Sequence, residues 1–205
     1  MKRDAQENAR ALYELAAAQG GYFTATQARQ AGYAYSQQHF HVSRGNWLRV
    51  DRGLFRLRGF PPGEREDLIR WSFWSRNQKG VPQAVVSHDT ALTVHDLSDV
   101  MPAQVHLTVP KGFRKKVPPG CVLHQATLGP QDVESRTGYR VTTPLRTLLD
   151  AVRSSLSQEH VNRAVSDALQ RGLVTRRLLE TAPGAPDGRD RLNRALAAAQ
   201  REPVA

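Results

Sequence analysis

Arginines and polar side chains between residues 36 and 58 are the strongest candidates for chemistry, and that chemistry is recognition of a polyanion. The stretch "WLRVDRGLFRL", residues 47–57, alternates arginine with apolar residues on both sides of a short break. Six arginines and one acid, Asp51, lie between Leu15 and Phe60, whereas residues 61–205 mix 20 basic with 15 acidic side chains. With a net charge of +10, this concentration favours nucleic acid as the partner.

The segment "YAYSQQHFHVSRG", residues 33–45, predicts a helix with a polar, basic outer face. If Val42 faces the core, four side chains point outward and a fifth lies on the flank: Ser36, Gln37, Phe40 and Arg44, with His41 on the flank. Near the core face we expect Tyr35, Gln38 and His39. Gln37 can pair with adenine, and Arg44 can reach guanine or a phosphate.

The quoted stretch predicts a two-stranded hairpin. Leu48 and Val50 are expected to face inward with Phe55 and Leu57, and the residues expected to face outward are Arg49, Arg56 and Arg58. Asp51-Arg52-Gly53 supplies the turn, where Gly53 can adopt positive φ. The outward arginines are expected to contact phosphate or the minor groove, with Arg52 at the tip inserted into the groove.

The elements before this hairpin complete a recognisable order. Residues 5–19 have helical periodicity and end at Gly20-Gly21, residues 22–23 are extended, and a second helix capped by Thr24 ends at Gly32. Helix, short strand, two helices and a hairpin is the order of a winged helix-turn-helix, in which the third helix enters the major groove. We therefore expect an α+β protein with an N-terminal DNA-binding domain.

A second, mixed α/β domain is expected to follow. The Pro- and Gly-rich stretch "RGFPPGERED" divides the chain into residues 1–60, residues 61–182, and residues 183–205 as a linker and C-terminal helix. Expected strands cover residues 104–110, 121–128 and 138–143. Expected helices cover residues 64–77, then segments capped by Ser87, Thr143, Ser157 and Thr175, and finally residues 189–200, docked on the domain or on a partner.

Catalytic and metal chemistry find little support in the sequence. No G-x-S-x-G, P-loop or H-E-x-x-H motif occurs, and Cys121 is a lone cysteine. His88 and His95 share a predicted helix face, but two turns separate them by about 10 Å, too far to share one ion. We expect no cofactor, no metal and no enzymatic activity; a nuclease is the weakest alternative, motivated only by basic charge and scattered acids.

The segment "QAGYAYSQQHFHVSRGNWLRVDRGLFRL" resembles the N-terminal winged-helix domain of the AbiEi family, antitoxins of bacterial type IV toxin–antitoxin and abortive-infection systems. Later segments, "VSHDTALTVHDLSDVMPAQVHLTVP", "PPGCVLHQATL" and "GYRVTTPLRTLLDAV", resemble the domain that follows in that family. The resemblance implies an autorepressor that binds repeats in its own promoter. It also implies a second domain that counters a nucleotidyltransferase-like toxin without a stable complex.

Two features of the resemblance affect individual residues. The family pattern places a capping Ser where this chain has Ala34, so the third helix could instead begin after Ser36, and Gln37 and Gln38 would then exchange roles. The expected antitoxin surface comprises Arg114, Lys115, Lys116 and Arg146; the three loop residues also fit a solvated turn or a nucleic-acid contact.

The remaining expectations concern location and assembly. No run of eighteen apolar residues occurs and the N-terminus lacks an apolar signal core, so we expect a cytoplasmic protein without membrane contact. The resemblance implies a monomer or weak dimer, with two copies on DNA. An orphan winged-helix regulator, whose second domain senses a ligand or mediates assembly, is the alternative to the antitoxin.

Overall fold

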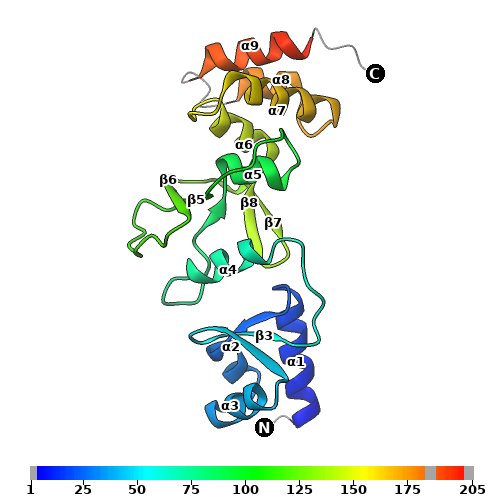
Figure 1. Ribbon diagram of the computed structural model, residues 1–205, viewed down its shortest axis with the longest axis vertical. Coiled ribbons are helices and arrows are strands. Elements are labelled where there is room, and N and C mark those ends of the chain that lie inside the picture. The colour runs from blue at the N-terminus through cyan, green and yellow to red at the C-terminus, as the bar shows by residue number, and fades with distance from the viewer. Residues whose placement is uncertain (1–3, 183–187, 201–205) are drawn as a thin grey trace. The chain divides into compact units, whose positions relative to one another are not determined.

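The computed structural model describes residues 4–182 and 188–200 (Figure 1). The predicted flexible joint at residues 183–187 lies outside the described residues. Backbone proximity groups the chain into two compact units, residues 1–74 with 137–139, and residues 75–136 with 140–205. Both units combine helices with a sheet, which confirms the predicted α+β class.

The first unit begins with the predicted helices. Helix α1, Ala5–Ala17, starts at Asp4, whose Oδ1 accepts the Glu7 N–H at 2.7 Å, and it is followed by Gly20 and Gly21 with positive φ. After strand β1, Tyr22–Thr24, the Thr24 hydroxyl accepts the Gln27 N–H and caps α2, Ala25–Gln30. Local capping chemistry therefore accounts for both helix starts.

Strand β1, which was predicted as a short extended segment, pairs with the predicted hairpin to make a three-stranded sheet. The hairpin consists of β2, Trp47–Asp51, and β3, Leu54–Leu57, joined by a turn in which Gly53 has φ +69°. The antiparallel order is β1-β3-β2, which places β3 in the centre. A central strand has neighbours on both edges and here is covered on both faces, so β3 does not alternate between core and solvent.

The two faces of β3 pack against different partners. Phe55 lies in a core cluster with Phe23 and Trp47, which make edge or tilted ring contacts, and with Leu12 of α1. Leu54 belongs to a second cluster that contains residues of α4, Glu66–Trp74. Because α4 packs on this sheet, the first unit runs past the predicted division after residue 60. Whether that division separates independently folding domains stays a prediction.

The second unit contains a five-stranded sheet of order β6-β5-β4-β8-β7. Its strands are β4, Val85–Val86; β5, Val105–Val109; β6, Cys121–Gln125; β7, Val133–Arg136; and β8, Tyr139–Thr142. Strands β5, β6 and β8 were predicted, whereas β4 and β7 were not. With two residues, β4 is too short to show periodicity. The short 3-10 turn η1, Pro130–Asp132, leads into β7.

Five helices complete the second unit (Figure 1). They are α5, His88–Val94; α6, Pro144–Ala151; α7, Gln158–Gln170; α8, Arg176–Thr181; and α9, Arg189–Ala199. Ser157 and Thr175 cap α7 and α8 through their side chains as predicted, whereas Ser87 and Thr143 precede α5 and α6 without a side-chain cap. Thus four predicted starts are correct, but two of the predicted capping bonds are not.

Helix α9 is part of the second unit's core. Leu192, Ala195 and Leu196 are buried in one cluster with Leu148 of α6 and Val165 of α7. Of the two predicted docking sites for this helix, its own domain and a partner, the structure shows the first. The apolar residues of α9 recur at helical spacing and so form one face of the helix. This face packs against α7.

Candidate nucleic-acid interface

The third helix, α3, spans Tyr35–Ser43 and begins at Ala34. The Ala34 side chain cannot cap the helix, but Gln37 Oε1 accepts the Ala34 N–H at 2.8 Å, which is one half of a capping box. Gln38 is buried, and its Nε2 donates to the carbonyls of Ala25 and Tyr33 at 3.0 Å each. The start after Ser36 is therefore not adopted, and Gln37 faces solvent while Gln38 anchors α3 to α2.

The outward face of α3 agrees with the sequence expectation. Ser36, Gln37, Phe40 and Arg44 are all exposed, and Phe40 keeps 52% of its surface accessible. The Arg44 guanidinium carbon lies 5.4 Å from the centroid of the Phe40 ring. The inward expectation was wrong for Tyr35 and His39, which are exposed; Gln38 is buried, and Val42 is partly buried against the core.

His41 lies between α3 and the sheet. Its ring stacks on Trp47 with centroids 4.7 Å apart and planes 14° apart, and Asn46 Nδ2 donates to its Nδ1 at 3.2 Å. Accepting at Nδ1 leaves the ring proton on Nε2, as a donor. Burial lowers the pKa of His41, so the ring is neutral at pH 7. His41 thus joins α3 to Trp47, the first residue of β2. Its predicted DNA contact would be made by the neutral ring through the Nε2–H donor.

The wing is the hairpin of β2 and β3 together with Arg58, which follows it. It presents three exposed arginines, Arg49, Arg52 and Arg58. Arg52 directly precedes Gly53 in the turn, and its backbone N–H donates to Asp51 Oδ1 at 2.6 Å. In β2 the inward position predicted for Leu48 was wrong, because this side chain is exposed, whereas Val50 is partly buried and Arg49 is exposed as predicted. Arg49 pairs across the sheet with Phe55, and Leu48 pairs with Arg56, so Arg49 shares the sheet face of Phe55. Arg49 is still exposed because β2 is an edge strand.

Arg56 does not face outward, which corrects the sequence prediction. Its side chain is 11% exposed, and Nη2 lies 2.8 Å from Glu66 Oε1. The same nitrogen donates to the carbonyls of Phe60 and Pro61 at 3.0 Å each, and the guanidinium carbon is 5.8 Å from the Tyr22 ring. Arg56 therefore ties β3 to the segment that leads into α4, since the second face of the central strand is covered.

One basic and aromatic pair was missed in the sequence. Arg29 of α2 is exposed, and its guanidinium carbon lies 6.0 Å from the ring of Tyr35, the first residue of α3. Tyr35 is 61% exposed. Arg29 belongs to the arginine-rich region, so its charge was a signal. Its closeness to Tyr35 depends on the turn between the helices, which periodicity does not reveal.

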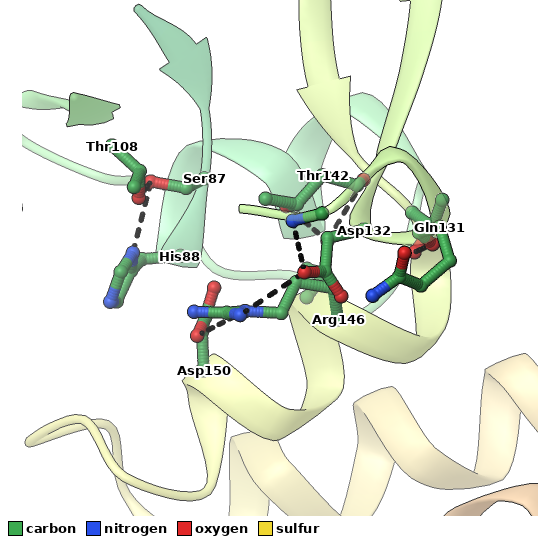
Figure 2. Close-up of polar contacts among 11 residues, drawn as sticks. Ser87, His88, Thr108, Gln131, Asp132, Thr142, Arg146 and Asp150 are labelled. Carbon is green, nitrogen blue, oxygen red and sulfur yellow. Dashed lines mark hydrogen bonds and ion pairs between the residues drawn. The ribbon is translucent and has the colours of Figure 1, made fainter. Parts of the chain in front are cut away.

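The four residues of the predicted antitoxin surface belong to two environments. Arg114, Lys115 and Lys116 are exposed in the connection between β5 and β6, where Phe113 is buried and anchors the loop. Arg146 of α6 is only 20% exposed, because its Nε lies 2.9 Å from Asp150 Oδ1 and its Nη1 lies 3.7 Å from Asp132 Oδ2 (Figure 2). Arg146 is therefore mostly engaged with carboxylates of its own unit, and the antitoxin role of all four residues stays a prediction.

Comparisons with known proteins locate the winged-helix segment within a family. Residues 10–58 match the model of a family described as "Transcriptional regulator, AbiEi antitoxin". This confirms the predicted resemblance for these residues, and the likeness of later segments stays a prediction. Among solved structures, the RV2827C protein from Mycobacterium tuberculosis is similar at 17% identity and a TM-score of 0.43, over 100% of this chain and 85% of that chain.

Neither a curated relative nor, in the described residues, a membrane-spanning helix is found. No curated protein sequence matches this chain. Within residues 4–182 and 188–200, no helix combines the length and apolar character that crossing a membrane requires.

Proposed function

We propose that this chain, in which residues 10–58 match the AbiEi antitoxin family of transcriptional regulators, is an autorepressor that binds repeats in its own promoter. The observation that carries the proposal is the exposure of Gln37, Phe40 and Arg44 on α3, while Gln38 fixes the helix from its other side. A helix anchored in this way presents a defined set of side chains to the major groove.

The exposed side chains divide into two roles by their chemistry. Gln37 retains its Nε2 donors after its Oε1 has accepted the Ala34 N–H, and Arg44 supplies guanidinium donors, so both can reach base edges. Phe40 offers an apolar surface for a thymine methyl group. Arg49, Arg52 and Arg58 are suited to phosphate or minor-groove contacts, which position the protein. We extend this second group to Arg29, beside Tyr35.

Fluorescence anisotropy tests the proposal directly. The full chain is titrated onto the duplex from upstream of its own gene and onto a scrambled duplex, each at several salt concentrations. We expect about a thousandfold tighter binding to its own DNA and a steep loss of affinity with salt. Equal, weak binding to both duplexes would contradict sequence-specific repression and leave the arginines as a general polyanion surface.

We infer that the second unit, without being an enzyme, supplies the antitoxin activity against a nucleotidyltransferase-like toxin with which it forms no stable complex. The exposed loop residues Arg114, Lys115 and Lys116 are the candidates for this surface. Co-expression with a neighbouring nucleotidyltransferase gene tests the inference: growth should recover with the full chain and recover less with the triple alanine variant. No rescue by the wild-type chain would favour the orphan regulator.

The setting of this function follows from the same proposal. A promoter-binding antitoxin acts in the cytoplasm, as a monomer or weak dimer that loads as two copies on repeated sites. Sedimentation of the free chain and of its operator complex measures both stoichiometries. A stable tetramer in the absence of DNA would contradict this mode of assembly.

A further inference from the structure

Three histidines meet in the second unit, on elements far apart in the sequence. His88 begins α5, His106 lies on β5 and His124 lies on β6. The rings of His88 and His124 are stacked, with centroids 3.5 Å apart and planes 11° apart, and His124 Nε2 lies 3.2 Å from His106 Nδ1. All three line a pocket of about 330 Å³, together with Asp150 and Arg153.

The hydrogen bonds of Ser87 allow the Nε2 nitrogen of His88 to carry the ring proton. The Thr108 hydroxyl donates to Ser87 Oγ at 2.8 Å, and Ser87 Oγ lies 3.0 Å from His88 Nδ1 (Figure 2). Because Ser87 accepts from Thr108, its own proton is free for His88 Nδ1, and the proton of the imidazole then resides on Nε2. His88 therefore offers a donor, and its stacked ring offers a flat surface.

The backbone of His88 is also unusual. Its φ is +50°, a left-handed conformation that non-glycine residues seldom adopt. Such a conformation persists only where the surrounding structure maintains it, and it is concentrated at binding and catalytic sites. Here the contacts of Ser87 and His124 hold the ring in place, so the strained residue is the one that lines the pocket.

Asp150 contributes a buried acceptor to the same pocket. Its side chain is 5% exposed, and Oδ1 accepts from Arg146 Nε at 2.9 Å. Oδ2 is buried and has no hydrogen-bond partner in the part of the chain that the structure describes. Figure 2 shows this arrangement, with one Asp150 oxygen joined to Arg146 and the other not. A buried carboxylate oxygen without a donor is unfavourable, so a ligand N–H would be bound there.

We propose that this pocket binds a nucleobase that carries an amino group beside a ring nitrogen, as adenine and cytosine do. Asp150 Oδ2 accepts from the exocyclic amine and His88 Nε2–H donates to the adjacent ring nitrogen, so the base lies close to the plane of the His88 ring. Uracil presents a carbonyl where these bases present the amine, so it would oppose one acceptor with another. A volume of about 330 Å³ is at the lower end of the range for small-ligand pockets.

The pocket combines a neutral His88 ring with Asp150 and two nearby guanidiniums, Arg146 and Arg153. Burial lowers the pKa of His88 to about 3, with the neighbouring histidines contributing, and burial also lowers the pKa of His124. Burial raises the pKa of Asp150, but the Arg146 guanidinium opposes that change and favours the carboxylate. Within the described residues no group of three or more His, Cys, Asp or Glu side chains is arranged to hold a metal ion, so coordination does not account for the cluster.

Nucleoside titration of the full-length chain, followed by amide chemical shifts, tests the inference. Adenosine, cytidine and uridine are added in parallel up to about 1 mM, the weak end of specific affinities. We expect adenosine or cytidine to shift the amides around His88 and Asp150, with uridine at least about tenfold weaker. In Asp150→Asn the amide nitrogen replaces the free acceptor, so adenosine and cytidine should bind at least about tenfold more weakly.

Matched variants separate recognition from folding. His124→Phe keeps a flat ring and should keep binding, whereas His88→Asn removes the ring donor, tolerates the left-handed backbone and should weaken binding at least about tenfold. Asp99→Asn, an exposed carboxylate, is the control and should change nothing. No shift with any nucleoside, equal shifts with all three, or unchanged adenosine and cytidine binding in a folded Asp150→Asn variant would overturn the proposal. It does not depend on DNA binding by the first unit.

Discussion

Arg56 Nη2 lies 2.8 Å from Glu66 Oε1 and joins the central strand of the first sheet to the first residue of α4. Glu66 Oε2 also accepts from the Tyr22 hydroxyl at 2.9 Å, and burial together with this carboxylate raises the pKa of Tyr22 to about 12. An arginine that appears in the sequence as a DNA contact is therefore a structural residue. It holds in place a strand that also supports the wing.

Replacing Arg56 should lower stability far more than replacing a wing arginine. Arg56→Ala leaves Glu66 without its cation and the carbonyls of Phe60 and Pro61 without a donor. We expect a loss of about 2–4 kcal/mol, below the upper end for a fully buried pair because Glu66 is 31% exposed. Urea unfolding measures it, with Arg52→Ala, exposed in the turn, as a control that should stay within about 0.5 kcal/mol. Equal stability of the two variants would contradict the structural role.

A serine at the start of α3 should stabilise the protein. Ala34 occupies the N-cap position with φ −60° and ψ 158°, a conformation that suits a capping serine. Ala34→Ser adds an acceptor for an unpaired N–H of the first turn, and we expect a gain of about 0.5–1 kcal/mol in unfolding free energy. Ala103→Ser, at an exposed position outside any helix, is a control for serine content. No gain would mean that Gln37 already satisfies this helix start.

Measurements of DNA affinity should distinguish the role of α3 from the role of the wing. Arg52→Ala should weaken binding similarly on all duplexes and reduce the salt slope by about one, because a phosphate contact is lost. Arg44→Ala should weaken the binding free energy by about 1–3 kcal/mol on the specific duplex and by little on the scrambled duplex. Arg10→Ala, an exposed arginine of α1, is the charge-matched control. Equal losses for Arg44 and Arg52 on both duplexes would remove the assignment of α3 as the reading helix.

Gln37 provides a second test of base reading, complicated by its bond to Ala34. Gln37→Ala should relax specificity and also lower stability, since the helix start loses its acceptor. Gln37→Glu keeps that acceptor and removes the amide donors, so it should relax specificity without destabilising the helix. The ratio of specific to scrambled affinity, measured beside thermal unfolding, distinguishes the two effects. An unchanged ratio in Gln37→Glu would exclude Gln37 as a base contact.

Mild acid should destabilise the second unit through His88. Burial lowers its pKa from 6.5 to about 3 in the folded chain. Between these values the unfolded chain binds a proton that the folded chain does not, so stability falls as the pH falls from 6.5 toward 3. We expect a loss of about 2 kcal/mol between pH 7 and pH 5 from this residue. In His88→Asn that part of the pH dependence should disappear; an identical pH profile for the two proteins would contradict the burial of a neutral ring.

Much of the first unit was readable from the sequence because its signals are local. The Thr24 cap, the glycines after α1 and the turn at Gly53 each act within a few residues, and so does the spacing that exposes Phe40 and Arg44. These features determined the helices, the hairpin and the outward face of α3. The same local logic predicted the starts of the helices in the second unit.

Tertiary structure alone decided the rest. Arg56 is buried because β1 and α4 enclose β3, and neither its own alternation nor its charge carries that information. The pairing of His88 with His124, and the acceptor of Asp150 beside them, depend on which strands become neighbours in the sheet. Periodicity describes how one element is oriented with respect to a core. What a side chain meets there depends on the other elements that pack against it, and those contacts exist only in the folded chain.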